Sequence, residues 1–277
     1  MIRVFPRRTP LTPDDNLAFV GDPPRDLPPL LPVKISVSFS YDIEEGKRLY
    51  WSWKRYYPLI QIGGPAFGDP GEEFVPGRFL KLGTVITSRG CVRSCPFCLV
   101  PEREGRRIRT LKITEGYNIQ DNNLLACPDS HIKEVFAMLS QQKDRASFSG
   151  GLDARLLKPW HVDLLKQARI DQMFFACDSW KGLLDLLRIS SMLKDFPRYK
   201  KRCYVLVGFM DESPLDAELR CLLVWALGFL PFAMRYKSGS EKAKFDPAWS
   251  KFLKTWCRPA ATKAHMKAFT QIKEVAL

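Results

Sequence analysis

The chain has 277 residues, of which 45% are hydrophobic, and its 43 Lys and Arg against 30 Asp and Glu give a formal net charge of +13. This length and composition predict a globular protein with one large α/β domain, or a domain plus an appendage. No stretch approaches the roughly 18 apolar residues of a membrane helix, and the first residues lack the apolar segment of a secretory signal, so we expect a cytoplasmic protein with no membrane partner. The positive charge fits a polyanion, an anionic small molecule or a solvated surface, and does not choose among them.

The first 32 residues are rich in proline and hold eight of the 21 prolines of the chain. Because proline interrupts helices and central strands, residues 1–32 are predicted to form an extended leader. Hydrophobic and polar residues then alternate over residues 33–40, which is the period of a strand. A helix over 43–56 and a short strand over 59–62 follow, so residues 33–80 are predicted to form a truncated Rossmann-like βαβ cap.

Strand and helix patterns alternate from residue 81 to residue 236, which predicts an α/β domain with parallel strands. In such a domain the functional side chains lie at the carboxyl ends of the strands. The pattern fits either a buried open sheet or a partial barrel. Helices are expected from Ser130 onward and over 159–167, 183–193 and 215–227. Strands are expected at 85–87, 119–126, 146–148, 172–176, 203–207 and 229–234.

The last segment, residues 237–277, is predicted to be a basic, aromatic-rich helical tail. From Arg235 onward there are ten Lys and Arg against three Asp and Glu. Lys and Arg can neutralise phosphates while aromatic rings stack on bases, which would suit a nucleotide or nucleic-acid substrate. The same residues at helical spacing also fit an amphipathic helix packed on the domain. The aromatic residues concerned are Tyr236, Phe245, Trp249, Phe252, Trp256 and Phe269.

Three cysteines, Cys91, Cys95 and Cys98, lie within eight residues, shortly after the strand predicted at 85–87. The spacing Cys-x3-Cys-x2-Cys puts three thiolates on one loop, one fewer than the four ligands of a closed iron–sulfur or structural zinc site. A metal held in this way keeps one position open for a cofactor. The alternatives are a zinc site completed by a distant residue and cysteines that only pack, and none of the three histidines is close in sequence.

This motif, with the aromatic Phe97 directly before its last cysteine, resembles the signature of the radical S-adenosylmethionine (SAM) superfamily. The lead-in Thr87-Ser-Arg-Gly is similar to that of the cobalamin-binding and methylthiotransferase-type members. Two further patterns follow in the order of that family. Residues 177–179 (Cys-Asp-Ser) resemble the Glu-Ser that ends the fourth barrel strand, and residues 204–213 resemble the fifth strand with its Gly-x-Pro-Gly-Glu-Thr ending.

The resemblance spans residues 81–236 and implies a partial (β/α)6 TIM-like barrel. It implies that Cys91, Cys95 and Cys98 hold a [4Fe–4S] cluster whose open iron position binds SAM, and that an external flavodoxin- or ferredoxin-like donor supplies the electron. Reductive cleavage of SAM then gives methionine and a 5′-deoxyadenosyl radical, which takes a hydrogen atom from a substrate that the sequence does not identify.

The resemblance also implies which residues contact SAM. The backbone of Phe97 is expected to meet the adenine, and Asp178 the ribose or amino group. Arg188 can pair with the carboxylate through its planar guanidinium, although an Arg on a helix also fits a solvated surface. Two glycines permit close backbone approach before Asp153 and Arg155, which either point into the site or form a tight turn with a surface ion pair.

Other features separate this chain from the members that it resembles. No histidine precedes His131 and no cysteine precedes Cys91, so we expect neither cobalamin bound through the family's His motif nor the second cluster of the methylthiotransferases. Cys127 and Cys177 end predicted strands and are either packed thiols or ligands near the site. Asp121, with the two asparagines after it, either lines the site or faces outward. A hypothesis of another class is a non-catalytic iron–sulfur or zinc-binding protein that contacts nucleic acid.

Overall fold

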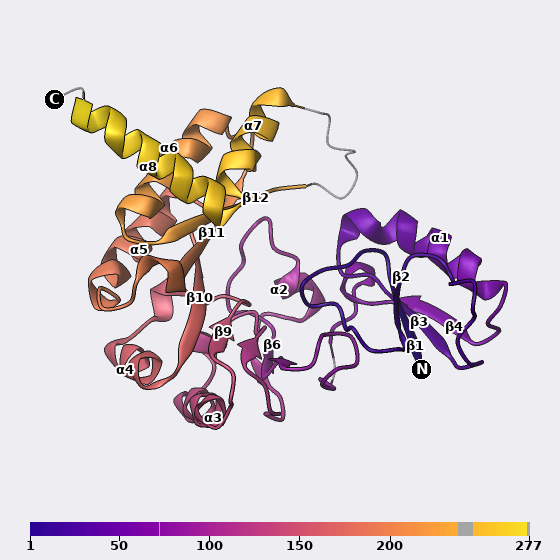
Figure 1. Cartoon of the computed structure of the whole chain (residues 1–277). Helices are drawn as coiled ribbons and strands as arrows, with labels where there is room; N and C mark the ends of the chain where they lie inside the picture. Colours follow the sequence, from indigo (N-terminus) through magenta and orange to yellow (C-terminus); the bar gives the residue numbers. More distant parts are fainter. Residues whose placement is uncertain (72, 238–245, 276–277) are drawn as a thin grey trace. The chain divides into compact units, whose positions relative to one another are not determined.

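The computed structural model describes residues 1–71, 73–237 and 246–275, with side chains described as far as residue 268. The chain forms two compact units, Met1–Asp144 and Arg145–Leu277 (Figure 1). Both are α/β with parallel strands, as the alternating pattern predicted. The division falls inside residues 81–236, so the extent of that segment as one domain stays a prediction.

The first unit contains a four-stranded parallel sheet in the order β2-β1-β3-β4, with helix α1 packed against β3 and β4. Ile35, Leu49 and Trp53 are fully buried in its core, and the indole nitrogen of Trp53 donates to the carbonyl of Gly21 at 3.0 Å. Burying such side chains stabilises the unit by roughly 25 cal/mol per Å² of apolar surface. The elements are β1 (Ile2–Phe5), β2 (Ala18–Val20), β3 (Val33–Ser36), α1 (Ile43–Lys54) and β4 (Ile60–Gly63), with 3-10 turns at Ser40–Asp42 and Pro65–Phe67.

The prediction of an extended leader was wrong for its first residues. Ile2–Phe5 form β1, an inner strand whose four residues are all buried and which pairs with both β2 and β3. Prolines exclude a central strand only where they stand, and the first proline of the chain, Pro6, comes directly after β1. The predicted βαβ cap is therefore part of a larger sheet that includes residues of the leader.

The rest of the first unit carries the cysteine motif on short elements. β5 pairs in parallel with β8, and β6 pairs in antiparallel fashion with β7. The motif follows β6, so the backbone that leads into its first cysteine is held by hydrogen bonds to β7. These elements are β5 (Thr84–Val85), β6 (Ser88–Arg89), α2 (Val100–Arg103), β7 (Arg109–Thr110), β8 (Asn118–Ile119) and α3 (Asp129–Ser140).

The strand predicted at 119–126 was wrong beyond its first residue. β8 ends at Ile119, and Leu124–Ala126 form a 3-10 turn instead. Four polar residues interrupt the predicted strand, and the side chain of one of them, Asp121, hydrogen-bonds the amide of residue 87 and the hydroxyls of residues 87 and 88. Beyond the end of β8, a side-chain carboxylate and not a backbone carbonyl therefore accepts from the amide of Thr87.

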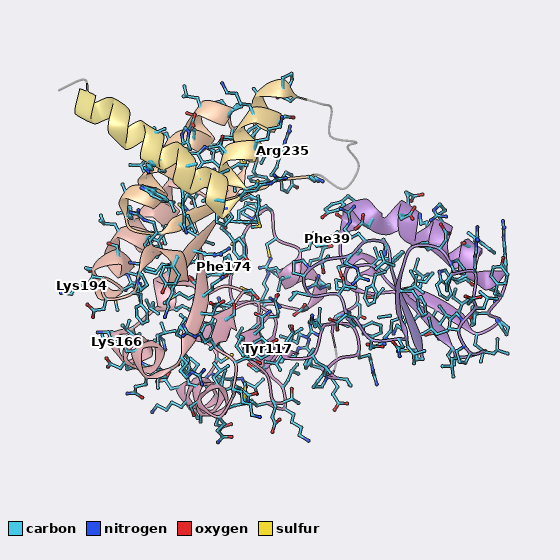
Figure 2. The ribbon with its side chains drawn as sticks, viewed as in Figure 1. Phe39, Tyr117, Lys166, Phe174, Lys194 and Arg235 are labelled. Atoms are coloured by element: carbon cyan, nitrogen blue, oxygen red, sulfur yellow. The ribbon has the colours of Figure 1, made fainter. Side chains whose placement is uncertain are left out.

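The second unit is a parallel sheet in the order β9-β10-β11-β12 with helices between successive strands, as predicted. Phe174 of β10, labelled in Figure 2, stacks on Tyr204 of β11 with ring centroids 4.4 Å apart. Among the described residues no sheet closes on itself. The elements are β9 (Ala146–Phe148), α4 (Pro159–Gln167), β10 (Ile170–Ala176), α5 (Trp180–Met192), β11 (Lys201–Val207), α6 (Pro214–Ala226) and β12 (Leu230–Arg235), with 3-10 turns at Ala154–Leu156 and Arg198–Lys200.

The C-terminal tail forms two helices, α7 (Pro247–Trp256) and α8 (Pro259–Val275). Trp249, Phe252 and Trp256 of α7 are each no more than 6% exposed. They therefore pack as the amphipathic-helix alternative predicted and do not lie open for stacking on bases.

Polar contacts hold the tail to the preceding elements. The indole nitrogen of Trp256 donates to Oε1 of Glu218 on α6 at 3.3 Å. The guanidinium of Arg235, labelled in Figure 2 at the end of β12, lies 5.1 Å from the ring centre of Trp249. Phe245 and the side chain of Phe269, which belong to the predicted aromatic set, lie outside the described residues. Within the described parts of the chain, no helix combines the length and apolarity needed to cross a membrane.

Candidate functional site

The cysteine motif begins at a turn that requires glycine. Gly90, directly before Cys91, has a φ of 83°, and a Cβ atom there would lie 2.2 Å from the carbonyl oxygen of Arg107. The amide of Gly90 donates to Oε2 of Glu104 at 3.0 Å, and the amide of Cys91 donates to the carbonyl of Gly105 at 3.2 Å. The start of the motif is thus fixed by the segment that follows the motif.

Glu104 ties this loop together, and sequence reasoning missed it. Its side chain is 1% exposed and accepts from Nδ2 of Asn122 at 2.6 Å as well as from Gly90. Arg103 forms an ion pair with it, and Arg89, whose pKa is lowered by burial, lies 3.6 Å away. A buried carboxylate needs such partners. No motif marks Glu104, because its partners come from three separate stretches of sequence.

The three motif cysteines are the ligands that the sequence predicts for an iron–sulfur cluster. All eight cysteines lie in described parts of the chain and none forms a disulfide. Cys91 is buried, while Cys95 and Cys98 are half-buried, and the amide of Cys98 donates to the carbonyl of Cys95 at 3.0 Å. The amide of Arg93 and Nδ2 of Asn123 lie 3.5 and 3.7 Å from Sγ of Cys91. Such N–H groups stabilise thiolate ligands of clusters, so the donors present suit the group.

A buried carboxylate anchors the segment that leads into the motif. Oδ1 of Asp121 accepts from the amide of Thr87 at 2.6 Å, and Oδ2 accepts from the hydroxyls of Thr87 and Ser88 at 2.7 and 2.6 Å. Asp121 is 1% exposed, and its burial raises the pKa of the carboxyl. Of the two alternatives for Asp121, the outward-facing one is therefore wrong, because the side chain lies inside the unit.

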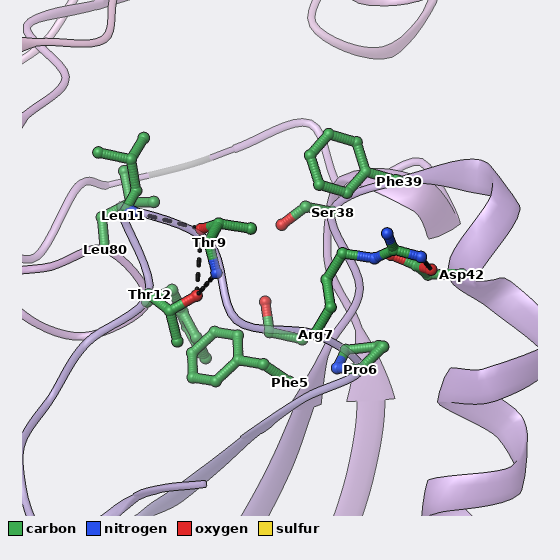
Figure 3. Close-up of a pocket in the computed structure, with 12 residues that line it drawn as sticks. Phe5, Pro6, Arg7, Thr9, Leu11, Thr12, Ser38, Phe39, Asp42 and Leu80 are labelled. Carbon is green, nitrogen blue, oxygen red and sulfur yellow. Dashed lines mark hydrogen bonds and ion pairs between the residues drawn. The ribbon is translucent and has the colours of Figure 1, made fainter. Parts of the chain in front are cut away.

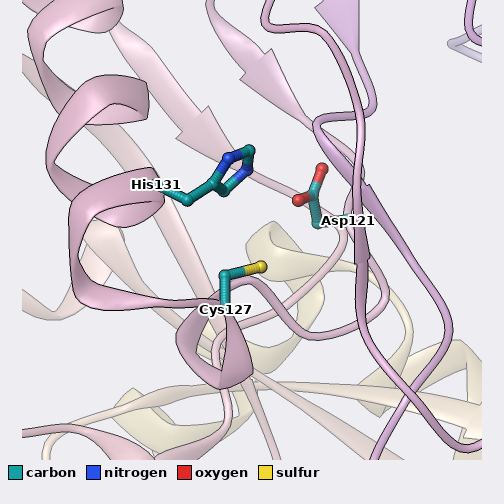
Figure 4. Close-up of side chains that lie close together, drawn as sticks. All are labelled: Asp121, Cys127 and His131. Atoms are coloured by element: carbon teal, nitrogen blue, oxygen red, sulfur yellow. The ribbon is translucent and has the colours of Figure 1, made fainter.

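Asp121 lies beside two further groups that can bind a metal. One ligand atom each from Asp121, Cys127 and His131 lies within 4.8 Å of the others, and all three residues are buried (Figure 4). Burial raises the pKa of the Cys127 thiol to about 11. Sequence reasoning named Asp121 and Cys127 but dismissed His131 as far from the motif. The spacing Cys127-x3-His131 was the signal that could have found it.

The residues expected to contact SAM are divided between the two units. Phe97 lies half-buried on the motif loop of the first unit. Asp153, Arg155, Asp178 and Arg188 lie in the second unit. The structure brings these four residues together around the carboxyl ends of β9 and β10 through hydrogen bonds and charge interactions.

Asp153 and Arg155 pair with each other. Nε of Arg155 donates to Oδ1 of Asp153 at 2.7 Å, and Nη2 donates to Oδ2 at 3.1 Å. The Asp153 side chain is 5% exposed and that of Arg155 is 43% exposed. The amide of Arg155 also donates to Oδ1 of Asp153 at 3.1 Å, which is the tight turn with an ion pair that the sequence left as one alternative.

Asp178 follows β10 and is held by the neighbouring strand. Its Oδ1 accepts from the amide of Leu206 on β11 at 3.0 Å. Burial raises the pKa of the carboxyl, although the charges of Arg220 and Arg155 oppose this shift. A carboxyl group at the end of a parallel strand, with cations nearby, is well placed to accept hydrogen bonds from a ligand.

Arg188 is engaged with the chain itself. Its Nη1 donates to the carbonyl of Leu157 at 3.2 Å, and its Nη2 donates to the carbonyl of Ala154. The guanidinium on α5 therefore holds the turn that carries Asp153 and Arg155. Arg188 is an exposed residue, as the surface alternative predicted, and two of its five N–H groups bind backbone carbonyls of this turn.

Arg220 is a second residue of the candidate site that sequence reasoning missed. It is 2% exposed, and its guanidinium donates to the carbonyls of Cys177 at 2.8 Å and Leu206 at 2.7 Å. It also forms an ion pair with Glu212, whose Oε2 accepts from the amide of Gly208 at 2.9 Å. Arg220 thus joins the ends of β10 and β11 to the loop that resembles the fifth-strand motif. An Arg in the middle of an apolar helix was the available signal.

A small pocket in the first unit lies away from the predicted site residues. Its volume is about 30 Å³, which holds about one water molecule. Figure 3 shows Arg7 and Asp42 in its wall, where Nε of Arg7 donates to Oδ2 of Asp42 at 2.6 Å. None of the cysteines lines it, and this ion pair satisfies the charged groups present.

Comparison with known proteins leaves the assignment to the geometry. No protein-family model matches the sequence, and no curated protein matches it significantly.

Proposed function

We propose that the chain is a radical SAM enzyme in which Cys91, Cys95 and Cys98 hold a [4Fe–4S] cluster. The observation that carries this proposal is the spacing of three thiols on one loop, with N–H groups at the sulfur of Cys91. Structural zinc sites are normally completed by a fourth protein ligand, whereas three thiolates leave one iron open for a cofactor. When bound, the cluster, reduced by a flavodoxin- or ferredoxin-like donor, supplies the electron that cleaves SAM into methionine and a 5′-deoxyadenosyl radical.

The fold that goes with this proposal is a partial (β/α)6 barrel. Its support is the order of parallel strands and helices, with β5 and β8 parallel in the first unit and β9 to β12 parallel in the second. The candidate residues also follow strands: Asp153 comes after β9 and Asp178 after β10. This is where α/β domains place the groups that contact ligands.

In this proposal the chain's own residues bind and orient SAM. The backbone of Phe97 borders the adenine, and Asp178, held by the amide of Leu206, accepts from the ribose or amino group. Asp153 and Arg155 form an ion pair on a turn, and Arg188 holds that turn through its carbonyls. We therefore assign Arg188 a positioning role.

The substrate class rests on charge alone. The net charge of +13 suits a phosphate-bearing substrate such as a nucleotide or nucleic acid. The described aromatic rings of α7 are buried, so they do not supply the stacking surface that a non-catalytic nucleic-acid module would need.

The decisive experiment is anaerobic reconstitution with iron and sulfide, followed by dithionite and SAM. We expect a brown protein that releases 5′-deoxyadenosine, and a colourless, inactive protein when Cys91, Cys95 and Cys98 are all replaced by Ala. Cys221→Ala is the matched control, because Cys221 is a fully buried thiol on α6 of the second unit, and this variant keeps both colour and product.

Two outcomes would contradict the proposal. A colourless protein whose motif cysteines hold zinc with a fourth side chain points to a structural zinc site. A brown protein that releases no deoxyadenosine with SAM under reducing conditions points to a non-catalytic iron–sulfur protein.

A further inference from the structure

Three different metal-binding side chains converge inside the first unit, separate from the cysteine motif. A carboxylate oxygen of Asp121, the sulfur of Cys127 and an imidazole nitrogen of His131 lie within 4.8 Å of one another (Figure 4). Asp121 is 1% exposed, while Cys127 and His131 are each 7% exposed. Carboxylate, thiolate and imidazole are the three ligand types that zinc uses in proteins. Their convergence in a buried place is therefore the pattern of a metal site rather than of a solvated acidic surface.

The local fold fixes where each of the three groups comes from. Cys127 ends the 3-10 turn Leu124–Ala126, where its amide donates to the carbonyl of Leu124 at 3.0 Å. His131 lies four residues later, in the first turn of α3. Asp121 comes from the loop after β8. A pair of ligands from one short turn with a third from another segment is a common way to build a metal site, because the pair is pre-positioned by local structure.

A second layer of hydrogen bonds orients the carboxylate. The hydroxyls of Thr87 and Ser88 both donate to Oδ2 of Asp121, while Oδ1 accepts from the amide of Thr87. Oγ1 of Thr87 also lies 3.2 Å from Nε2 of His131. Metal ligands are usually held by outer hydrogen bonds of this kind, which set their orientation.

We propose that Asp121, Cys127 and His131 bind a zinc ion, with one coordination position left for water or an oxygen-bearing ligand. With zinc bonds of about 2.0–2.3 Å, neighbouring ligands of a tetrahedral site lie about 3.5 Å apart, so the three side chains close in by about 1 Å. Binding exchanges the thiol proton of Cys127 for the metal, while His131 remains neutral by carrying its proton on the other ring nitrogen. The proton from the thiol goes to solvent.

Without a metal, residues of this region form a hydrogen-bond network. The Ser88 hydroxyl, Asp121, the Thr87 hydroxyl and His131 are then linked in that order, and the Cys127 thiol lies beside them. If the three residues bind zinc, the protein retains one zinc per chain. If they form only the hydrogen-bond network, it retains none. The proposal does not depend on the radical SAM assignment, because none of its three ligands belongs to the cysteine motif.

The test uses the full-length chain with Cys91, Cys95 and Cys98 replaced by Ala, so that the motif cannot take up zinc. After exposure to zinc and exhaustive dialysis, elemental analysis is expected to find one zinc per chain. Adding Cys127→Ser or His131→Ala removes that zinc, whereas adding Cys221→Ala does not. Cobalt in place of zinc is expected to give sulfur-to-metal charge-transfer absorption that Cys127→Ser abolishes. Ser88→Ala, which removes an outer hydrogen bond, is expected to weaken zinc about 10- to 100-fold in chelator competition.

Absence of zinc from the parent, or the same zinc content in the Cys127→Ser and His131→Ala variants, would overturn the proposal and leave the hydrogen-bond network. If the triple Ala chain does not fold, the wild-type protein with its cluster reconstituted is analysed instead. The zinc then appears in addition to the cluster iron and is lost in His131→Ala while the iron stays. This separates failure of the zinc site from failure of the cluster assignment.

Discussion

Nε2 of His131 lies 3.2 Å from Oγ1 of Thr87, which links the first turn of α3 to the segment that leads into the cysteine motif. The Thr87 hydroxyl donates its own proton to Asp121, so its oxygen accepts from the imidazole. The buried carboxylate and the start of the motif are therefore parts of one hydrogen-bonded structure. A substitution at Asp121 is expected to alter the position of Cys91, because Asp121 binds Thr87 and the backbone of residues 87–91 connects Thr87 to Cys91.

Replacing Asp121 by Ala is expected to destabilise this region by on the order of 3 kcal/mol, because it leaves the amide of Thr87 and two hydroxyls buried without their acceptor. Hydrogen exchange of residues 84–131 measures the effect. Asp129→Ala is the control, since Asp129 is an exposed acid in the first turn of α3. Equal protection in both variants would show that the network contributes no stability.

Asn123→Ala is expected to shift the reduction potential of a reconstituted cluster to a more negative value. Nδ2 of Asn123 lies 3.7 Å from Sγ of Cys91, and hydrogen bonds to ligand sulfurs favour the more negatively charged, reduced cluster. Redox titration followed by electron paramagnetic resonance measures the shift. Asn122→Ala serves as control, because Asn122 donates to Glu104 and not to a cysteine. An unchanged potential in Asn123→Ala would mean that this contact does not reach the metal ligand.

Asp178→Asn is expected to stabilise the second unit increasingly as the pH rises above 3.8, the ordinary pKa of Asp. Burial raises the pKa of Asp178, so between 3.8 and that raised pKa the folded wild type keeps a proton that the unfolded chain has lost. Wild-type stability therefore falls as the pH rises through this window, and Asn lacks this dependence. Urea unfolding at a series of pH values measures the difference.

The control for the pH experiment is a carboxyl with the opposite shift. The pKa of the exposed Asp195 is lowered by its hydrogen bond to Lys166. Wild type is therefore expected to gain stability over Asp195→Asn as the pH rises through the range below 3.8. Parallel pH curves for Asp178→Asn and wild type would contradict the assigned direction for Asp178.

Arg220→Met is expected to cost about 3–5 kcal/mol, because it leaves the partly buried Glu212 without its cation and removes the buried donors to two strand-end carbonyls. Adding Glu212→Gln to this variant is expected to restore part of the loss, since the uncompensated charge is then gone. Thermal unfolding of the single and double variants measures the coupling. Additive losses would show that the two side chains act independently.

The Arg188→Lys variant distinguishes two roles of Arg188, which are holding the turn at residues 154–157 and binding the carboxylate of SAM. Lys keeps the charge but lacks the fork that reaches the carbonyls of Ala154 and Leu157, so a loss of about 1.5–3 kcal/mol is expected. Faster hydrogen exchange over residues 152–157 is the expected signature. If exchange is unchanged while SAM affinity falls, Arg188 binds the cofactor directly instead.

Periodicity predicted the second unit well because its strands are long and buried. β10 and β11 carry apolar runs bounded by helices with clear apolar faces, and these patterns are local. The prediction failed at residues 119–126, where a single carboxylate binds residues that precede it by more than 30 positions. Such a contact leaves no periodic trace.

The same contrast between local patterns and long-range contacts applies to the candidate site. The cysteine spacing is local and was found, and so was the Asp153–Arg155 turn as one of two alternatives. Glu104 and Arg220 were missed because their importance comes from burial beside partners far along the chain. A charged residue in sequence reads as a surface residue until its surroundings are known.

The position of β1 between β2 and β3 has a consequence for folding during synthesis. Ile2 pairs with Val33, and Arg3 pairs with Ala18, so β1 is synthesised before both of its neighbouring strands. The four residues of β1 are all buried in the folded unit. On the nascent chain they stay exposed to solvent until β2 and β3 have been synthesised. This interval, before β3 has been translated, is when the nascent chain is most open to chaperones and to aggregation.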